Sequence, residues 1–137
     1  RALPVAGTPF DFRAAKAVGR DIDTAAEQLR LVNGYDHHFC VDGAGLRRAA
    51  VLRGNSSGIA MTMDTTSPGV QLYTANAFPP ACVCKDGAVY RAHQAFCLET
   101  QQFPNAANFS HFPAPFIAAN ARCASETAYQ FPQISDE

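Results

Sequence analysis

The sequence predicts an all-β fold, with a sandwich of antiparallel sheets favoured over a closed barrel. Its apolar runs are short, and Gly, Pro and Asn interrupt them where strands give way to turns. Within the runs, apolar and polar side chains alternate, as they do where one face of a strand is buried. The one stretch with a helical pattern, residues 24–31, is short.

The first expected strand lies in "GYDHHFCV", residues 34–41. Because side chains alternate across a strand, Asp36 and His38 share one face and His37 lies on the other. Neighbouring histidines on a strand cannot hold one metal ion together, so this pair does not predict a metal site. One of the two is expected to be a core histidine whose ring nitrogens are satisfied by the protein.

A hairpin is expected next along the chain. Residues 47–52 form its first strand, "RGNSSG" forms its turn, and residues 59–65 form its returning strand. Alternation groups Ile59, Met61 and Met63 on one face of the returning strand. The two methionines are therefore expected in the core.

The second half of the chain alternates short strands with long loops. The expected elements are a strand at 70–74, a long loop at 76–87, a short strand at 88–90, a strand at 95–101, an ordered loop at 103–115 and a final strand at 126–131. The long loop contains Cys82-x-Cys84, which lacks the second pair of ligands that a structural zinc site needs. We therefore interpret this cysteine pair as a chance occurrence.

Composition indicates a globular protein of 137 residues, a length that suggests one domain with its own core. With 17% charged residues and a formal net charge of -1, the charge balance favours neither nucleic acid nor an anionic membrane as partner. No apolar run is long enough to span a bilayer. The five cysteines, an odd number at irregular spacing, favour reduced thiols and a cytoplasmic location.

One acid stands inside an apolar run, Glu99 in "AFCLETQQFP". A charge removed from water is costly unless it is paired or has a chemical role. Alternation places Glu99 with Gln101 on a face of small and polar side chains, which suits the wall of a polar cavity. A structural acceptor or ion-pair partner is the commoner role for a half-buried glutamate, so this position by itself leaves both roles open.

Two more strands have a similar polar face. Asp36 lies on the polar face of its strand, and Gln71 shares a face with Tyr73. Carboxylates and amides can hold hydroxyls by paired hydrogen bonds, and an aromatic ring can cover the apolar side of a sugar ring. These strands are therefore expected to offer a polar cleft to a neutral polyol.

Four stretches carry a resemblance to a known family. They are "VAGTPFDFR" at residues 5–13, "GYDHHF" at 34–39, "SPGVQLYTAN" at 67–76 and "FCLETQQFPNAANFSHFP" at 96–113. In these stretches and in their order, the chain resembles the C-terminal part of the aldose 1-epimerases, or galactose mutarotases. The last stretch is the most specific, since Leu-Glu-Thr-Gln followed by Pro, Asn and Phe-Pro at these offsets is hard to obtain by chance.

The resemblance implies part of a large antiparallel β-sandwich, the galactose mutarotase-like supersandwich, with an open sugar cleft. Residues 1–137 would be the C-terminal part of one such domain, with the N-terminal half outside this chain. The family interconverts the α and β anomers of free aldoses such as galactose and glucose, without a cofactor or metal. The implied partners are a monosaccharide and the N-terminal half, with no nucleic acid and no membrane.

By the same resemblance, Glu99 matches the catalytic base and is expected to be partly desolvated. Asp36 and Gln71 match residues that hold sugar hydroxyls. The family's proton donor is a histidine in the N-terminal part, for which this chain has no counterpart. Among the histidines here, His38 shares a face with Asp36 and is the expected stand-in. Two positions depart from the family pattern, which usually has Asn in place of His38 and Gly in place of Ala95.

Two alternative functions remain open on the sequence. One is a carbohydrate-binding or sensing protein on the same scaffold that does not turn sugar over. The other is a mutarotase for phosphorylated sugars, which needs a cluster of arginines to hold phosphate. The available arginines are scattered along the sequence at Arg47, Arg48, Arg53 and Arg91.

Overall fold

The computed structural model describes residues 2–132. The chain divides into two compact units: unit 1 is Arg1–His37 with Gln71–Leu98, and unit 2 is His38–Val70 with Glu99–Glu137. The strands are β1 (Asp36–Cys40), β2 (Arg47–Arg53), β3 (Ala60–Thr65), β4 (Gly69–Tyr73), β5 (Cys82–Val83), β6 (Val89–Tyr90), β7 (Cys97–Gln101) and β8 (Thr127–Gln130). The helical elements are α1 (Glu27–Val32) and the 3-10 turns η1 (Val18–Arg20), η2 (Lys85–Gly87) and η3 (Ala106–Asn108). The predicted all-β class is confirmed.

The described strands form two three-stranded sheets and one two-stranded sheet. Their orders are β1-β4-β7, β2-β3-β8 and β5-β6. The pairing of β3 with both β2 and β8 is antiparallel, and so is the pairing of β5 with β6. Across residues 2–132, no helix has both the length and the apolar character needed to cross a membrane.

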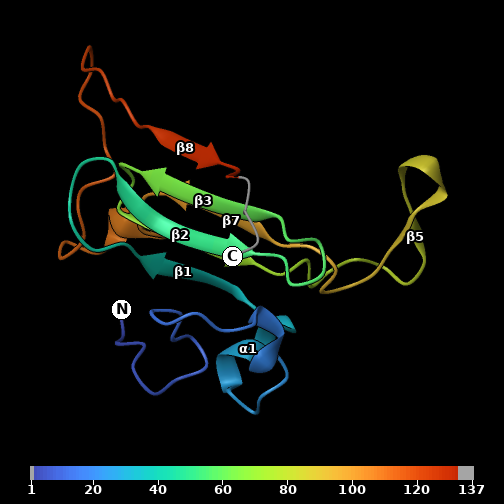
Figure 1. Cartoon of the computed structure of the whole chain (residues 1–137). Coiled ribbons are helices and arrows are strands. Elements are labelled where there is room, and N and C mark those ends of the chain that lie inside the picture. Colours follow the sequence, from blue (N-terminus) through green and yellow to red (C-terminus); the bar gives the residue numbers. More distant parts are fainter. Residues whose placement is uncertain (1, 133–137) are drawn as a thin grey trace. The chain divides into compact units, whose positions relative to one another are not determined.

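The β2-β3-β8 sheet belongs to unit 2, and its strands lie side by side in Figure 1. Met63 of β3 is fully buried and Met61 is half-buried, which confirms the predicted apolar face for both methionines. Ile59 does not share that face, because it is 62% exposed and lies before the strand begins. Its carbonyl accepts a hydrogen bond from the backbone N–H of Gly54 at 2.8 Å, so it closes the turn instead.

A cluster of threonines joins β7 to this sheet within unit 2. Thr127 Oγ1 of β8 lies 3.1 Å from Thr65 Oγ1 of β3 and 2.9 Å from Thr100 Oγ1 of β7. Because side chains alternate along a strand, the bond made by Thr100 turns Glu99 and Gln101 to the opposite face of β7. The cluster therefore determines which side of the strand carries the acid.

Two expected elements differ in their bounds. The helix expected over 24–31 begins three residues later, because Thr24 bonds back to the carbonyl of Asp21 in a turn. It ends at Asn33, which has the left-handed φ of 54° typical of a helix C-terminus. The loop expected over 76–87 contains β5, a strand of two residues that is too short to show alternation in the sequence.

Arg47, at the start of β2, gathers backbone carbonyls from separate segments of unit 2. Its guanidinium donates five hydrogen bonds of 2.8–3.1 Å. The accepting carbonyls belong to Val41, Asp42, Gly45, Thr65 and Ser67. A guanidinium has five N–H donors in a fixed fork, so every donor is used. The loop after β1, the end of β3 and the turn before β4 are thereby tied to one another.

Arg47→Lys in the full-length protein should lower the free energy of unfolding by about 2 kcal/mol or more. Lysine carries three donors on a single nitrogen and leaves carbonyls without partners. Arg53→Lys, at an exposed position on the same strand, is the matched control and should change stability by less than about 0.5 kcal/mol. Urea unfolding measures both, and equal effects of the two substitutions would contradict the role given to Arg47.

Candidate functional site

Two of the predicted sugar-binding residues meet in unit 1. Gln71 Nε2, on β4, donates a hydrogen bond of 2.7 Å to Asp36 Oδ1 at the start of β1. Asp36 is exposed and Gln71 is half-buried. A carboxylate has about four acceptor positions, so the amide can orient the Asp36 carboxylate while other positions accept hydrogen bonds from a ligand. The pairing is compatible with a site that holds hydroxyls.

Tyr35, the residue before Asp36, fixes where β1 begins. Its backbone N–H donates to Thr74 Oγ1 at 2.9 Å, and its carbonyl accepts from Asn76 Nδ2 at 3.0 Å and from the backbone N–H of Thr74 at 3.0 Å. Its ring is fully buried, and its hydroxyl donates to the carbonyl of Pro9 at 2.8 Å. These bonds join the chain at Tyr35 to the segment just after Gln71, and so hold Asp36 beside Gln71.

Gly34 is required by this arrangement. Its φ of +134° lies in the region that favours glycine. A Cβ there would lie 2.5 Å from Asn76 Oδ1 and 2.7 Å from Thr74 Oγ1. Any side chain at this position would displace the two groups that bond to Tyr35.

His37 packs against aromatic rings, on the face predicted for it. Its ring lies 4.7 Å from the ring of Phe10 and 6.5 Å from that of Tyr35. Its Nδ1 accepts a hydrogen bond from the backbone N–H of Asp36 at 2.9 Å. Burial lowers the pKa of His37, and the charge of Asp36 opposes this only in part. The ring is therefore mainly neutral near pH 7 and serves packing.

His38 does not have the geometry of a stand-in acid. Gln101 Nε2 lies 3.2 Å from His38 Nδ1, and an amide nitrogen can only donate, so Nδ1 accepts. The other nitrogen, Nε2, is buried without a hydrogen-bond partner and packs against Gly69, where an added Cβ would overlap the ring. Burial lowers the pKa of His38. Its remaining nitrogen is thus closed off from solvent and from a ligand.

Glu99 lies in the middle of β7 in unit 2 and is exposed. The expected partial desolvation is therefore wrong for the described chain. Its strand neighbours explain why: Thr100 faces the β2-β3-β8 sheet, and Glu99 faces the other way. Gln101, on the same side as Glu99, is bonded to His38.

The two remaining histidines, His93 and His111, lie in loops. His93 Nε2 lies 2.6 Å from the carbonyl oxygen of Asn33, and this bond joins the loop after β6 to the end of α1. The ring of His111 lies 4.2 Å from that of Phe112. Both contacts are structural.

The arginines that could have held a phosphate are engaged elsewhere. Arg47 donates to five carbonyls, and Arg48 Nε donates to Asp64 Oδ1 at 2.6 Å. The bonds of both arginines lie within unit 2. This removes two of the four donors on which the phosphorylated-sugar alternative depends.

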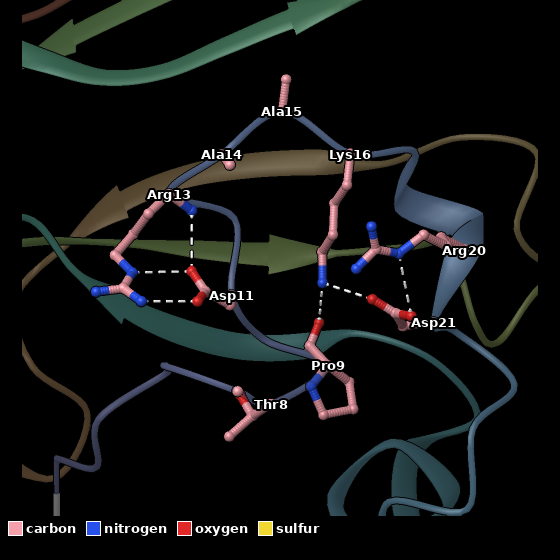
Figure 2. Close-up of a pocket in the computed structure, with 10 residues that line it drawn as sticks. Thr8, Pro9, Asp11, Arg13, Ala14, Ala15, Lys16, Arg20 and Asp21 are labelled. Atoms are coloured by element: carbon pink, nitrogen blue, oxygen red, sulfur yellow. Dashed lines mark hydrogen bonds and ion pairs between the residues drawn. The ribbon is translucent and has the colours of Figure 1, made fainter.

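The N-terminal segment of unit 1 surrounds a cavity of about 710 Å³ (Figure 2). Lys16 Nζ donates to the carbonyl of Pro9 at 2.5 Å and to Asp21 at 2.7 Å, and lies 4.3 Å from the centre of the Phe12 ring. Figure 2 also shows Arg13 paired with Asp11, an interaction that holds the pKa of that carboxyl well below its usual range. Lys16 and Arg13 are therefore each paired with an acid from the same segment.

Sequence reasoning missed the role of this segment in building the site. The Pro9 carbonyl accepts from both Lys16 and the Tyr35 hydroxyl, and the rings of Phe10 and Phe12 lie 5.8 Å and 5.3 Å from the Tyr35 ring. The "TPFDF" stretch thus packs around the residue that positions Asp36. The clustered aromatic residues were the available signal.

Comparison with known proteins gives consistent matches. A family model described as "Aldose 1-epimerase" matches residues 1–130. A galactose mutarotase from Sus scrofa is 40% identical over 111 residues, which cover 80% of this chain and 31% of that protein. The galactose mutarotase of Homo sapiens is 36% identical over 129 residues, covering 93% of this chain and 36% of its own length. An aldose 1-epimerase from Escherichia coli is 33% identical over 131 residues, covering 93% and 37%.

A solved structure has the same fold. The aldose epimerase homologue from C. elegans aligns with a TM-score of 0.75 and 28% sequence identity, covering 96% of this chain and 38% of that one. The chain therefore spans about a third of the length of the relatives that it matches.

His38, which is half-buried with its Nε2 enclosed, provides a test based on pH. The unfolded chain binds a proton at His38 with the ordinary pKa of about 6.5, and the folded chain binds it less tightly. The free energy of unfolding should therefore be greatest above about pH 6.5 and should fall as the pH drops toward the lower pKa that His38 has in the folded chain.

In urea unfolding at pH 7.5 and 5.5, His38→Asn should reduce this loss of stability relative to the parent protein. His111→Asn, in an exposed loop, is the control, and an unchanged pH dependence in His38→Asn would contradict the role assigned to burial.

Proposed function

The chain belongs to the aldose 1-epimerase family, and we propose that the protein carrying it interconverts the α and β anomers of free hexoses such as galactose and glucose. The observation that carries the proposal is the 2.7 Å hydrogen bond between Gln71 and Asp36. Both residues match family positions that hold sugar hydroxyls, and the bond leaves an oriented, exposed carboxylate. Hydrogen bonds among Tyr35, Thr74 and Asn76 hold the backbone beside Asp36 in place.

Anomer exchange needs one group that removes a proton and one that supplies a proton. A base takes the proton from the C1 hydroxyl while an acid gives one to the ring oxygen, so the C1–O5 bond breaks and an aldehyde forms. Rotation about the C1–C2 bond and ring closure on the other face reverse these transfers. Each group can contribute roughly 100- to 10,000-fold to the rate. Glu99 is our candidate for the base.

The acid is assigned to a part of the protein outside residues 1–137. His38 is closed off by its packing, and His37, His93 and His111 make the structural contacts described above. Glu99 is exposed, and a base gains strength when its charged form is partly removed from water. We therefore propose that the N-terminal part both supplies a histidine and covers Glu99.

Exposed apolar side chains in unit 2 support a covering partner of this kind. Val51, Phe116 and Phe131 are 67%, 74% and 66% exposed, and β2 and β8 stand at the two edges of their sheet. Unpaired sheet edges and apolar surface favour association with another segment. The family resemblance indicates that this other segment is the N-terminal part of the same protein.

Glu99→Gln should lower the mutarotation rate of the full-length protein by about 100-fold or more while leaving the fold and sugar binding intact. Glutamine keeps the size of the side chain but cannot take a proton from the C1 hydroxyl. Polarimetry on freshly dissolved α-D-glucose or α-D-galactose measures the rate. A near-normal rate would remove Glu99 from the mechanism.

Asp36→Ala provides the contrasting variant in the same assay. It removes a hydroxyl acceptor, so affinity for the sugar should fall by roughly 1–3 kcal/mol for each buried hydrogen bond lost. An unchanged affinity and rate would show that the assignment of Asp36 is wrong.

If the parent protein binds sugar without accelerating mutarotation, the non-catalytic sugar-binding function replaces the enzyme proposal.

A further inference from the structure

The two cysteines of the Cys82-x-Cys84 motif lie together on a small hairpin of unit 1. β5 and β6 pair antiparallel, with Cys82 opposite Tyr90 and Val83 opposite Val89, and η2 forms the connection between them (Figure 1, yellow). Cys84 directly follows β5 and has an extended backbone, so both thiols lie on one side of the chain, and Sγ of Cys82 lies 3.7 Å from Sγ of Cys84. Val83, between them, is 68% exposed on the other side.

Backbone bonds hold both cysteines in place. The N–H of Cys84 donates to the carbonyl of Ala88 at 2.7 Å, and the N–H of Cys82 donates to the carbonyl of Pro79 at 3.3 Å. Both cysteines are free and half-buried, so their thiols are still reachable from solvent. The backbone bonds place the two residues so that their sulphurs can lie within reach of one ion.

We propose that Cys82 and Cys84 form a bidentate site for a soft, thiophilic cation of the Cu(I) class. Thiolates are the protein ligands that such ions prefer. With metal–sulphur bonds of about 2.3 Å, sulphurs 3.7 Å apart subtend an angle of about 107° at the ion. That angle suits a trigonal or tetrahedral ion that keeps one or more small ligands from solution.

Other metals fit this site less well. Structural zinc requires four protein ligands, and among residues 2–132 no group of three or more His, Cys, Asp or Glu side chains could hold a metal ion. Magnesium and calcium need oxygen ligands. A soft monovalent ion is the class that two thiolates can hold without further protein ligands.

The binding step balances without an oxidant. Two S–H bonds break, two bonds from sulphur to Cu(I) form, and two protons pass to the buffer. No electron is transferred. The site lies on the hairpin and does not depend on the sugar chemistry proposed above.

The test is a competition between the reduced full-length protein and a chromogenic Cu(I) chelator under anaerobic conditions. The parent protein should withdraw one equivalent of Cu(I) that Cys82→Ser and Cys84→Ser each fail to withdraw. Cys123→Ser, which removes an exposed cysteine elsewhere, should retain that equivalent. Circular dichroism on all four proteins checks that the fold is kept.

Three results would overturn the site. One is equal Cu(I) uptake by the parent and Cys82→Ser, and another is loss of the equivalent in Cys123→Ser alone. The third is a reduced parent protein whose intact mass, measured under native conditions, shows no bound copper after Cu(I) is added. Loss of the equivalent in both motif variants with retention in the control supports the proposal.

Discussion

The hydrogen bonds on the backbone of Tyr35 are the constraint on which the candidate site depends. They tie the start of β1 to Thr74 and Asn76, just beyond the end of β4. With that junction fixed, Asp36 and Gln71 stand opposite one another, and a hydrogen bond between their side chains follows. Gly34 leaves the room for this junction, and the buried ring of Tyr35 anchors it to the N-terminal segment.

Unit 2 uses buried polar groups in the same way. The threonines around Thr127 hold β7 to the β2-β3-β8 sheet and thereby turn Glu99 outward. Arg47 uses all five of its donors on backbone carbonyls, and polar groups satisfied in this way rigidify a fold. In both units, buried polar groups determine where the candidate site residues are placed.

Alternation along strands predicted much of this arrangement. It placed most strands within two residues of their observed ends, separated His37 from His38, and put Met63 in the core. The motif resemblance identified Asp36 and Gln71, and the structure brings those two together. Alternation could not detect β5, because two residues contain no repeat.

Other features could not be predicted because they depend on contacts between distant residues. The burial of His38 Nε2 requires the close approach of Gly69, and the face to which Glu99 points follows from the bond between Thr100 and Thr127. The five carbonyls around Arg47 come from two loops and the end of β3, and only the folded chain brings these segments together. The sequence also showed the cysteine pair, but it could not show the backbone geometry that brings the two sulphurs to 3.7 Å.

The central proposal is that Glu99 is the base of a mutarotase, that Asp36 and Gln71 hold sugar hydroxyls, and that the acid lies in another part of the protein. The most direct measurement is the mutarotation rate by polarimetry of residues 1–137 alone and together with the N-terminal part of the same protein. The account predicts a poorly soluble chain with no activity above the buffer rate, and a soluble, active species once the N-terminal part is added. A soluble, monomeric chain of 137 residues that accelerates mutarotation by itself would contradict it.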